Sequence, residues 1–176
     1  MIKHDVSEPS DSPWTSPVLV VKKPGAAPRF CGDFRKLNNI TEKDSFPLPR
    51  IEDILSSVGD AQYYSTMDLL AGYGQIPVHP EDKPKLAFVT PDGLFQFKVM
   101  PFGPTNAPSV FQRHMQVVLG GLKWQNRLVY IDDIIIFSKT FEKHLDDIDS
   151  VFSRMRKYNM KVKLKKCHFC QEETHY

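Results

Sequence analysis

Two adjacent carboxylates interrupt an otherwise apolar run, VYIDDIIIFS, over residues 129–138. Burial of an unpaired carboxylate costs several kcal/mol, so Asp132 and Asp133 need either a cation or a place beyond the core. A third carboxylate, Asp68, ends a second apolar stretch, QYYSTMDL. If the three gathered on the surface of one sheet, they would repel one another unless a cation neutralised them.

Magnesium meets that requirement, because it prefers oxygen ligands and completes its shell with water and substrate phosphates. Two such ions about 3.5–4 Å apart activate an attacking hydroxyl and stabilise a leaving pyrophosphate oxygen. The carboxylates therefore indicate phosphoryl transfer by positioning and electrostatics, without a covalent enzyme intermediate. The alternative is a plain hairpin turn at Asp132-Asp133, since aspartate is a good turn former and a dipeptide is a weak motif.

Strands must position these side chains. A turn at Asp132-Asp133 makes LVYI and IIIF the arms of one hairpin, with the acids at its bend. The stretch that ends at Asp68 is a further predicted strand. Alternation and the turn residues of PGAAP and TPDG predict two more hairpins and a cationic C-terminal strand. These segments are 18–23 with 29–34, 86–90 with 94–100, and 160–169.

Helical spacing of apolar residues predicts helices over 49–58, 106–119 and 140–159. Thr140 is a plausible N-cap of the last, and Gly120-Gly121 stops the second. The expected buried stripe of 106–119 is Val110, Phe111, Met115, Val118 and Leu119. That of 140–159 is Leu145, Ile148, Phe152 and Met155.

Strands and helices mix without a regular βαβ rhythm, which predicts an α+β fold with an antiparallel sheet backed by helices. The proline-rich residues 1–17 are expected to form an extended arm. With 176 residues, 41% hydrophobic and 25% charged, the chain has a globular composition. No signal peptide is visible, and no apolar run approaches the roughly 18 residues of a membrane span. Three cysteines are too few for a disulfide scaffold and suit a reducing compartment.

The net charge of +2 is a weak argument for a nucleic-acid partner, but the cations are clustered. One cluster has no acid among its members, which are Arg154, Arg156, Lys157, Lys161, Lys163, Lys165 and Lys166. A second, with one acid at Asp33, comprises Lys22, Lys23, Arg29, Arg35 and Lys36. Such clusters suit a bound polyanion, and an ordinary solvated face is the alternative.

Six segments, in this order, resemble the motifs of reverse transcriptases. They are DFRKLN, STMDLLAGYGQIPV, AFVTPDGLFQFKVMPFG, NAPSVFQR, VYIDDIIIFSK and LKKCHF. The resemblance runs from about Trp14 to the C-terminus, and MPFG, NAP and EKHL are similar to gypsy-type LTR retrotransposons. Some positions depart from the family pattern without removing a catalytic group: Pro28, Gly32, Leu70 and Pro104.

The resemblance implies the fingers and palm of a right-hand polymerase. Fingers are expected over roughly 18–60 and 75–105, palm over 61–74 and 106–176, with thumb, connection and ribonuclease H absent. The implied function is RNA-directed DNA polymerase, which adds deoxynucleotides to a primer 3′-hydroxyl with two Mg²⁺ ions, Mn²⁺ being a substitute. The alternatives are a truncated, non-catalytic remnant that binds nucleic acid, and an RNA-copying RNA polymerase, which Tyr73 disfavours.

The resemblance also implies roles by position. Asp68, Asp132 and Asp133 are the catalytic and metal-binding carboxylates. The nucleotide-binding residues are Lys22 and Arg29 on the triphosphate, Tyr73 beneath the sugar, and Phe102 and Gly103 in the pocket wall. The template- and primer-binding residues are Asn106, Pro108 and Tyr130, with Lys166, Cys167, His168 and Phe169 as a primer grip.

The implied partners are an RNA or DNA template with its primer, deoxynucleoside triphosphates and the remainder of a polymerase polyprotein, and no membrane. The expected location is the cytoplasm, including virus-like particles, or the nucleus. A competing motif is Cys167-x-x-Cys170-x4-His175, which has the opening spacing of a zinc knuckle. It lacks a fourth ligand in knuckle spacing, and a tetrahedral zinc site normally needs four.

Overall fold

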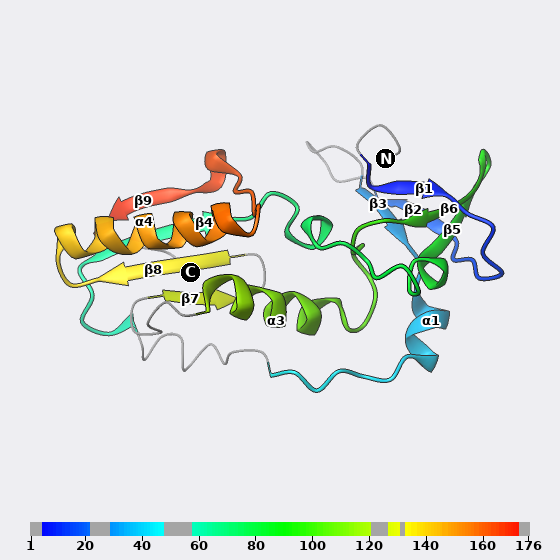
Figure 1. The fold of residues 1–176 in the computed structure, drawn as a ribbon, viewed down its shortest axis with the longest axis horizontal. Coiled ribbons are helices and arrows are strands. Elements are labelled where there is room, and N and C mark those ends of the chain that lie inside the picture. The colour runs from blue at the N-terminus through cyan, green and yellow to red at the C-terminus, as the bar shows by residue number, and fades with distance from the viewer. Residues whose placement is uncertain (1–4, 22–28, 48–57, 121–126, 131–132, 173–176) are drawn as a thin grey trace. The chain divides into compact units, whose positions relative to one another are not determined.

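The structure is a computed structural model that describes residues 5–21, 29–47, 58–120, 127–130 and 133–172 (Figure 1). The chain divides into two compact units. Unit 1 comprises Met1–Asp44 and Tyr73–Ala107, and unit 2 comprises Ser45–Gly72 and Pro108–Tyr176. The helix predicted over 49–58 lies outside the described residues except at Val58. The assignment of fingers and palm ranges stays a prediction.

Unit 1 is built from two antiparallel sheets. One has the strand order β1-β6-β5, and the other pairs β2 with β3. The strands are β1 (Ser7–Pro9), β2 (Val18–Val21), β3 (Arg29–Gly32), β5 (Ala87–Thr90) and β6 (Gly93–Phe97). The short helices in this part of the chain are α1 (Arg35–Ile40), η2 (Gly72–Gln75) and η3 (Pro84–Leu86). Both predicted hairpins are present, and the segment predicted as an extended arm contributes β1 to a sheet.

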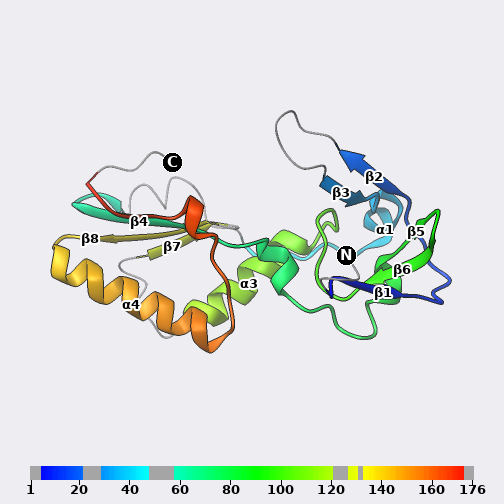
Figure 2. The same cartoon turned by 90° about the horizontal axis from the view of Figure 1, so that it is seen from above.

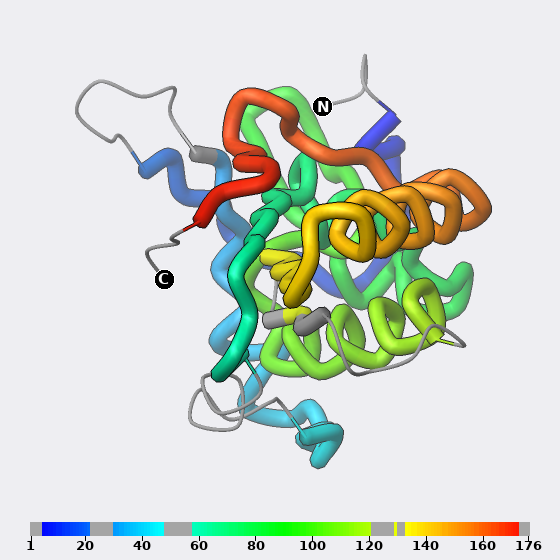
Figure 3. The backbone as a smooth tube through the Cα atoms, turned by 90° about the vertical axis from the view of Figure 1, so that its left-hand side faces the viewer, coloured from blue at the N-terminus to red at the C-terminus, as the bar shows by residue number. Residues whose placement is uncertain are grey.

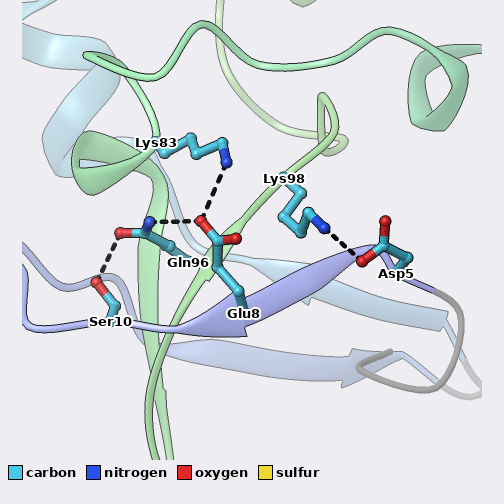
Figure 4. Close-up of polar contacts among 6 residues, drawn as sticks. All are labelled: Asp5, Glu8, Ser10, Lys83, Gln96 and Lys98. Carbon is cyan, nitrogen blue, oxygen red and sulfur yellow. Dashed lines mark hydrogen bonds and ion pairs between the residues drawn. The ribbon is translucent and has the colours of Figure 1, made fainter.

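Polar contacts fasten β1 to β6 (Figure 4). The Glu8 carboxylate accepts hydrogen bonds from Gln96 Nε2 at 2.8 Å and from Lys83 Nζ at 3.1 Å. Ser10 Oγ donates to Gln96 Oε1 at 2.8 Å, and Lys98 forms an ion pair with Asp5. The hydrogen bond from Gln96, followed by that from Lys83, lowers the pKa of Glu8 below its usual value. The N-terminal segment is therefore held by side chains as well as by the ladder.

Three phenylalanines, Phe34, Phe88 and Phe97, form the core of unit 1. The ring centroids of Phe88 and Phe97 are 4.7 Å apart, a distance typical of favourable aromatic pairs. A Cβ atom at Gly32 would lie 2.7 Å from Phe34 Cε2, and one at Gly103 would lie 3.1 Å from Phe34 Cδ2. Gly103 also has a φ of 114°, which glycine adopts readily. The departure from the family pattern at Gly32 thus makes room for the buried ring of Phe34.

Unit 2 holds a four-stranded antiparallel sheet with the order β7-β8-β4-β9. Its strands are β4 (Tyr63–Asp68), β7 (Arg127–Tyr130), β8 (Asp133–Ser138) and β9 (His168–Gln171). Its helices are α3 (Ala107–Leu119), α4 (Phe141–Lys157) and the 3-10 turn η5 (Leu164–Lys166). Figure 2 shows α3 and α4 on the same side of the sheet, and Figure 3 shows β9 beside β4.

Strand β8 is buried along nearly its whole length, as its unbroken apolar sequence predicts. Ile134 and Ile136 are fully buried, while Ile135 and Phe137 pack with Val58, Ala61 and Tyr64. Two-sided burial accounts for a continuous apolar run in place of the alternation of a half-exposed strand. Asp133 is the exposed first residue of this strand.

Helix α3 follows its prediction closely. Phe111, Met115, Val118 and Leu119 are buried, and Val110 is partly buried. The helix ends at Leu119, immediately before the predicted Gly120 stop. Its amide side chain at Gln112 is also buried, and Gln112 Nε2 donates to the Val129 carbonyl of β7 at 3.1 Å. This hydrogen bond ties α3 to the strand that leads to the carboxylate pair.

The N-cap of α4 is confirmed, and Met155 is buried as predicted, but the prediction was wrong for the other three residues of the stripe. Thr140 Oγ1 accepts a hydrogen bond from Lys143 N. Leu145 is 47% exposed, and Ile148 and Phe152 are only partly buried. The buried residues of α4 are His144, Asp147, Val151 and Met155. The buried face includes a histidine and an aspartate because serines on β4 and β8 supply hydrogen bonds, which the spacing of apolar residues does not reveal.

Candidate functional site

Asp68 and Asp133 face each other across two paired strands. Asp68 is the last residue of β4, Asp133 is the first residue of β8, and the ladder makes them register partners. On its other edge Asp133 is the register partner of Tyr130, the last residue of β7. The predicted hairpin arms are thus confirmed as β7 and β8. Asp132, which follows Tyr130 by two residues, lies outside the described residues.

A cation lies beside this pair. Lys166 Nζ is 2.7 Å from Asp68 Oδ2, and the Asp68 side chain is 21% exposed. Partial burial, together with the neighbouring charge of Asp68, raises the pKa of the Asp133 carboxyl, while Lys166 opposes that rise. The two carboxylates therefore repel each other, and the ammonium of Lys166 reduces the repulsion.

Backbone hydrogen bonds deliver Lys166 to this position. Lys163 N donates to the Asp68 carbonyl at 2.8 Å, and Leu70 N donates to the Lys161 carbonyl at 2.9 Å. Leu69 and Val162 form an isolated antiparallel bridge between these contacts. Helix η5 then turns the chain, with Lys166 N donating to the Lys163 carbonyl. The resemblance predicts a primer-grip role for Lys166 but not its contact with Asp68, because 98 residues separate the two in the sequence.

The donor set suits a hard divalent cation. Two carboxylates at the adjacent ends of paired strands, one of them paired with an ammonium, form a site of concentrated negative charge with oxygen ligands. Asp132 belongs to the predicted set but is not described. Within the described part of the chain, no group of three or more histidine, cysteine, aspartate or glutamate side chains could hold a metal ion. That statement covers Cys167, His168 and Cys170 but not His175 of the competing zinc motif.

The residues predicted to bind the nucleotide belong to unit 1. The rings of Tyr73 and Phe102 have centroids 5.0 Å apart, and Tyr73 is buried whereas Phe102 is 55% exposed. Asn38 Nδ2 donates to the Gly103 carbonyl at 2.9 Å, which fixes the loop beside Phe102. Arg29 begins β3 opposite Val21. Lys22 lies outside the described residues.

The predicted template residues at the start of α3 have structural partners. Asn106 Oδ1 accepts from Asp44 N at 3.0 Å, and Asn106 Nδ2 donates to the Glu42 carbonyl at 2.8 Å. Both polar atoms of this side chain thus hold residues 42–44 against the loop before α3. Pro108 is the second residue of α3 and is partly buried.

The predicted primer-grip residues point in different directions. Lys166 contacts Asp68, whereas Cys167 Sγ donates to the Lys163 carbonyl at 3.4 Å. His168 is exposed and is the register partner of Thr66. The ring of Phe169 packs on Phe152 of α4, with centroids 6.0 Å apart. Their use in gripping a primer stays a prediction.

One member of the basic cluster has a structural role inside unit 2. Arg154 Nε donates to the Val118 carbonyl at 2.7 Å, and Arg154 Nη2 donates to the Val117 carbonyl at 3.0 Å. These carbonyls belong to the last turn of α3, where an α-helix has acceptors without intrahelical donors. Arg154 therefore caps α3 from α4. Of the other cations of the cluster, Lys166 pairs with Asp68, and a role of the cluster in phosphate contacts stays a prediction.

Comparison with known proteins defines the class to which this fold and carboxylate pair belong. The family model described as reverse transcriptase (RNA-dependent DNA polymerase) matches residues 21–176. The chain belongs to the reverse transcriptase family, which generally uses divalent metal ions. The resemblance identified from the six sequence motifs is thereby confirmed.

The relatives specify the kind of reverse transcriptase that it resembles. The chain is 41% identical over its whole length to the retrovirus-related Pol polyprotein from transposon 297 of Drosophila melanogaster. It is 38% identical over its whole length to that from transposon gypsy of the same fly. It spans 17% of the first relative and 18% of the second. The expected similarity to gypsy-type elements is confirmed.

Solved structures confirm the α+β polymerase fold. The native protease–reverse transcriptase of prototype foamy virus matches with a TM-score of 0.86 and 26% identity, over 96% of this chain and 22% of that one. The foamy viral enzyme in complex with an RNA/DNA hybrid matches with a TM-score of 0.87 and 25% identity, over 96% of this chain and 22% of that one.

Among the described residues, no helix is long and apolar enough to cross a bilayer.

Proposed function

We propose that this chain supplies the polymerase site of an RNA-directed DNA polymerase from a gypsy-type retrotransposon. The observation that carries the proposal is the register pairing of Asp68 with Asp133 across β4 and β8. Membership of the reverse transcriptase family supports it. The reaction is attack of a primer 3′-hydroxyl on the α-phosphate of a deoxynucleoside triphosphate, which releases pyrophosphate.

The carboxylates Asp68, Asp132 and Asp133 would hold two Mg²⁺ ions, with Mn²⁺ as a substitute. When bound, the metal lowers the pKa of the attacking hydroxyl and stabilises charge on the leaving oxygen. The protein itself fixes the position of Asp68 and Asp133 through the β4–β8 ladder. Lys166 moderates their mutual repulsion in the absence of metal and would have to yield Asp68 Oδ2 to a bound cation.

Selection of the deoxyribose sugar is assigned to Tyr73. Its ring is buried and packs against Phe102, so its position is fixed by contact with a second aromatic side chain. A rigid ring beneath the sugar would exclude a 2′-hydroxyl by steric overlap, with Phe102 and Gly103 forming the pocket wall. Lys22 and Arg29 would bind the triphosphate as cations.

The proposed macromolecular partner is an RNA or DNA template annealed to a primer. Structures of the related foamy viral enzyme hold double-stranded DNA or an RNA/DNA hybrid, which supports this choice. Asn106, Pro108, Tyr130 and the segment Lys166 to Phe169 are assigned to template and primer, and the rest of a Pol polyprotein is the proposed protein partner. Such an activity belongs in the cytoplasm, in virus-like particles, or in the nucleus.

Primer extension on an RNA template with Mg²⁺ and deoxynucleotides tests the proposal. Asp68→Asn should abolish extension, because a lost metal ligand removes several kcal/mol of transition-state stabilisation. Asp146→Asn, an exposed carboxylate on α4, is the matched control and should extend at the wild-type rate. Extension by Asp68→Asn near the wild-type rate would disprove the metal assignment.

A wild-type protein that binds primer–template but does not extend it would instead support the alternative, a non-catalytic remnant that binds nucleic acid. Binding is therefore measured in the same samples by fluorescence anisotropy of a labelled primer. In that case Asp68→Asn should bind as tightly as the wild-type protein or tighter, since it removes a negative charge.

A further inference from the structure

A buried polar network lies in unit 2 between the sheet and α4. Its members are Ser65 on β4, Ser138 at the end of β8, and His144 and Asp147 on α4; each is at most 6% exposed. Buried polar groups are nearly always hydrogen-bonded, because an unsatisfied one is costly. Neither the proposed chemistry nor the predicted apolar stripe of α4 uses these residues.

In this polar network, one assignment of donors and acceptors satisfies all the hydrogen bonds. Ser138 Oγ donates to Asp147 Oδ2 at 2.9 Å, so Ser138 Oγ is free to accept from His144 Nδ1 at 3.1 Å. A neutral imidazole with its proton on Nδ1 has an acceptor at Nε2, which lies 2.8 Å from Ser65 Oγ. Burial lowers the pKa of His144 and thus favours this neutral ring, while the charge of Asp147 and a hydrogen bond with the Tyr64 backbone act in the opposite direction. Ser65 therefore donates to His144.

On the side of the sheet, the polar network is hydrogen-bonded to strand β9 through Ser65. Cys170 N donates to Ser65 Oγ at 3.0 Å. The β4–β9 ladder shifts register at this point, since Tyr64 pairs with Gln171 and Thr66 pairs with His168. One residue of β4, Ser65, thus faces two residues of β9, which defines a β-bulge. Cys170 has a φ of 52°, which non-glycine residues rarely adopt.

The bulge follows directly after the segment that carries Lys166. The segment before β9 is held at one end by the bond from Lys163 N to the Asp68 carbonyl, and at the other by the pairing of His168 with Thr66. Without the bond to Ser65, regular pairing would relieve the left-handed conformation at Cys170 and move the preceding residues along β4 by one position. A slip of one residue in a strand reverses the face of each side chain.

We propose that Ser65 and His144 are positioning residues, which act through the β9 bulge to hold the Lys166 ammonium against Asp68. The inference deepens the proposed function, on which the importance of Asp68 rests. His144 orients the hydroxyl of Ser65, Ser65 anchors Cys170, and the bulge at Cys170 sets the register that places Lys166. The catalytic carboxylate is thereby supported from α4, through contacts that never touch it.

The reactivity of Lys166 tests this inference without requiring activity. Acetylation by an N-hydroxysuccinimide ester, followed by mass spectrometry of the metal-free protein, compares Lys166 with its neighbour Lys165. Ser65→Ala should acetylate faster at Lys166 relative to Lys165, by about twofold to fivefold, the scale of a partly exposed ion pair. His144→Asn should do the same, because its shorter side chain retains a donor for Ser138 but does not reach Ser65.

Val151→Ala is the matched control for a general loss of stability. Val151 is a fully buried residue of α4 that does not belong to the polar network. This variant should leave the ratio of Lys166 to Lys165 acetylation unchanged. An unchanged ratio in both Ser65→Ala and His144→Asn, or an equal rise in Val151→Ala, would overturn the inference.

A second measurement reads the effect on catalysis. In primer extension, Ser65→Ala should change kcat in the same direction as Lys166→Gln, with little change in KM for the deoxynucleotide, and should have no further effect in a Lys166→Gln background. An equal change of kcat in both backgrounds would mean that Ser65 does not act through Lys166. If the wild-type protein has no extension activity, the proposed function fails, whereas the acetylation ratio still decides the positioning of Lys166.

Discussion

Asp68 and Asp133 are register partners on neighbouring strands, and their charges repel. The raised pKa of Asp133 means that the folded protein binds more protons than the unfolded chain, at pH values just above the ordinary pKa of aspartate. Stability therefore falls as the pH rises through that window, and the ionised carboxylate is a cost at neutral pH. The proposed cation site would carry this cost whenever no cation is bound.

Asp133→Asn should stabilise the metal-free protein at neutral pH. Because the group is largely exposed, the expected rise in Tm is only about one or two degrees. The rise should shrink as the pH falls toward and below about 3.9, the ordinary pKa of aspartate, because a growing fraction of Asp133 is then protonated in both folded and unfolded states. Thermal unfolding monitored by circular dichroism, with Asp146→Asn as the control, measures the difference. A lower Tm for Asp133→Asn at neutral pH would contradict the expected repulsion.

Tyr73→Val should relax discrimination against ribonucleotides. Removal of the ring opens space beneath the sugar, so the ratio of kcat/KM for ribonucleotide over deoxynucleotide should rise by about tenfold or more. Tyr73→Phe keeps the ring and its packing on Phe102, and should retain the wild-type ratio. If Tyr73→Val also retains it, Tyr73 is simply a core aromatic residue.

Variants of Arg154 and Lys165 should distinguish a cation that stabilises the fold from one that binds nucleic acid. Arg154→Gln removes two hydrogen bonds to the last turn of α3 and should lower the free energy of unfolding by about 1–3 kcal/mol. It should leave the salt dependence of primer–template binding unchanged. Lys165→Gln should leave stability unchanged and reduce the log–log salt slope by about 0.9 if Lys165 neutralises one phosphate of a duplex. Urea unfolding and a salt titration of binding distinguish the two, and the opposite pattern would reverse the assignments.

Gly32→Ala should destabilise unit 1. The added Cβ would overlap the ring of Phe34, and overpacking of this kind costs about 1–3 kcal/mol. Phe34→Leu removes the overlap at the expense of core packing. The double variant should therefore be more stable than the sum of the two single changes predicts. Additive losses in urea unfolding would show that Gly32 is required for another reason.

The sequence alone predicted those elements of the fold that depend on residues close together along the chain. Turn residues and apolar alternation predicted the β2–β3 and β5–β6 hairpins, because these interactions are close along the chain. A fully apolar run predicted β8, and helical spacing with a following glycine predicted α3. Helix α1 was not predicted, since its six residues bury no side chain and thus carry no amphipathic pattern.

Relationships between distant residues were decided by tertiary structure. Three carboxylates predicted a cation site, but only the β4–β8 register makes Asp68 the partner of Asp133. Likewise, only the contacts of residues 161–166 with the end of β4 bring Lys166 to Asp68. The predicted buried face of α4 was correct at Met155 but wrong by one position at Leu145, Ile148 and Phe152, for the same reason. A histidine and an aspartate are buried at low cost only where they find hydrogen-bond partners. Here the partners Ser65 and Ser138 lie on β4 and β8, so the spacing of apolar residues within α4 carries no information about them.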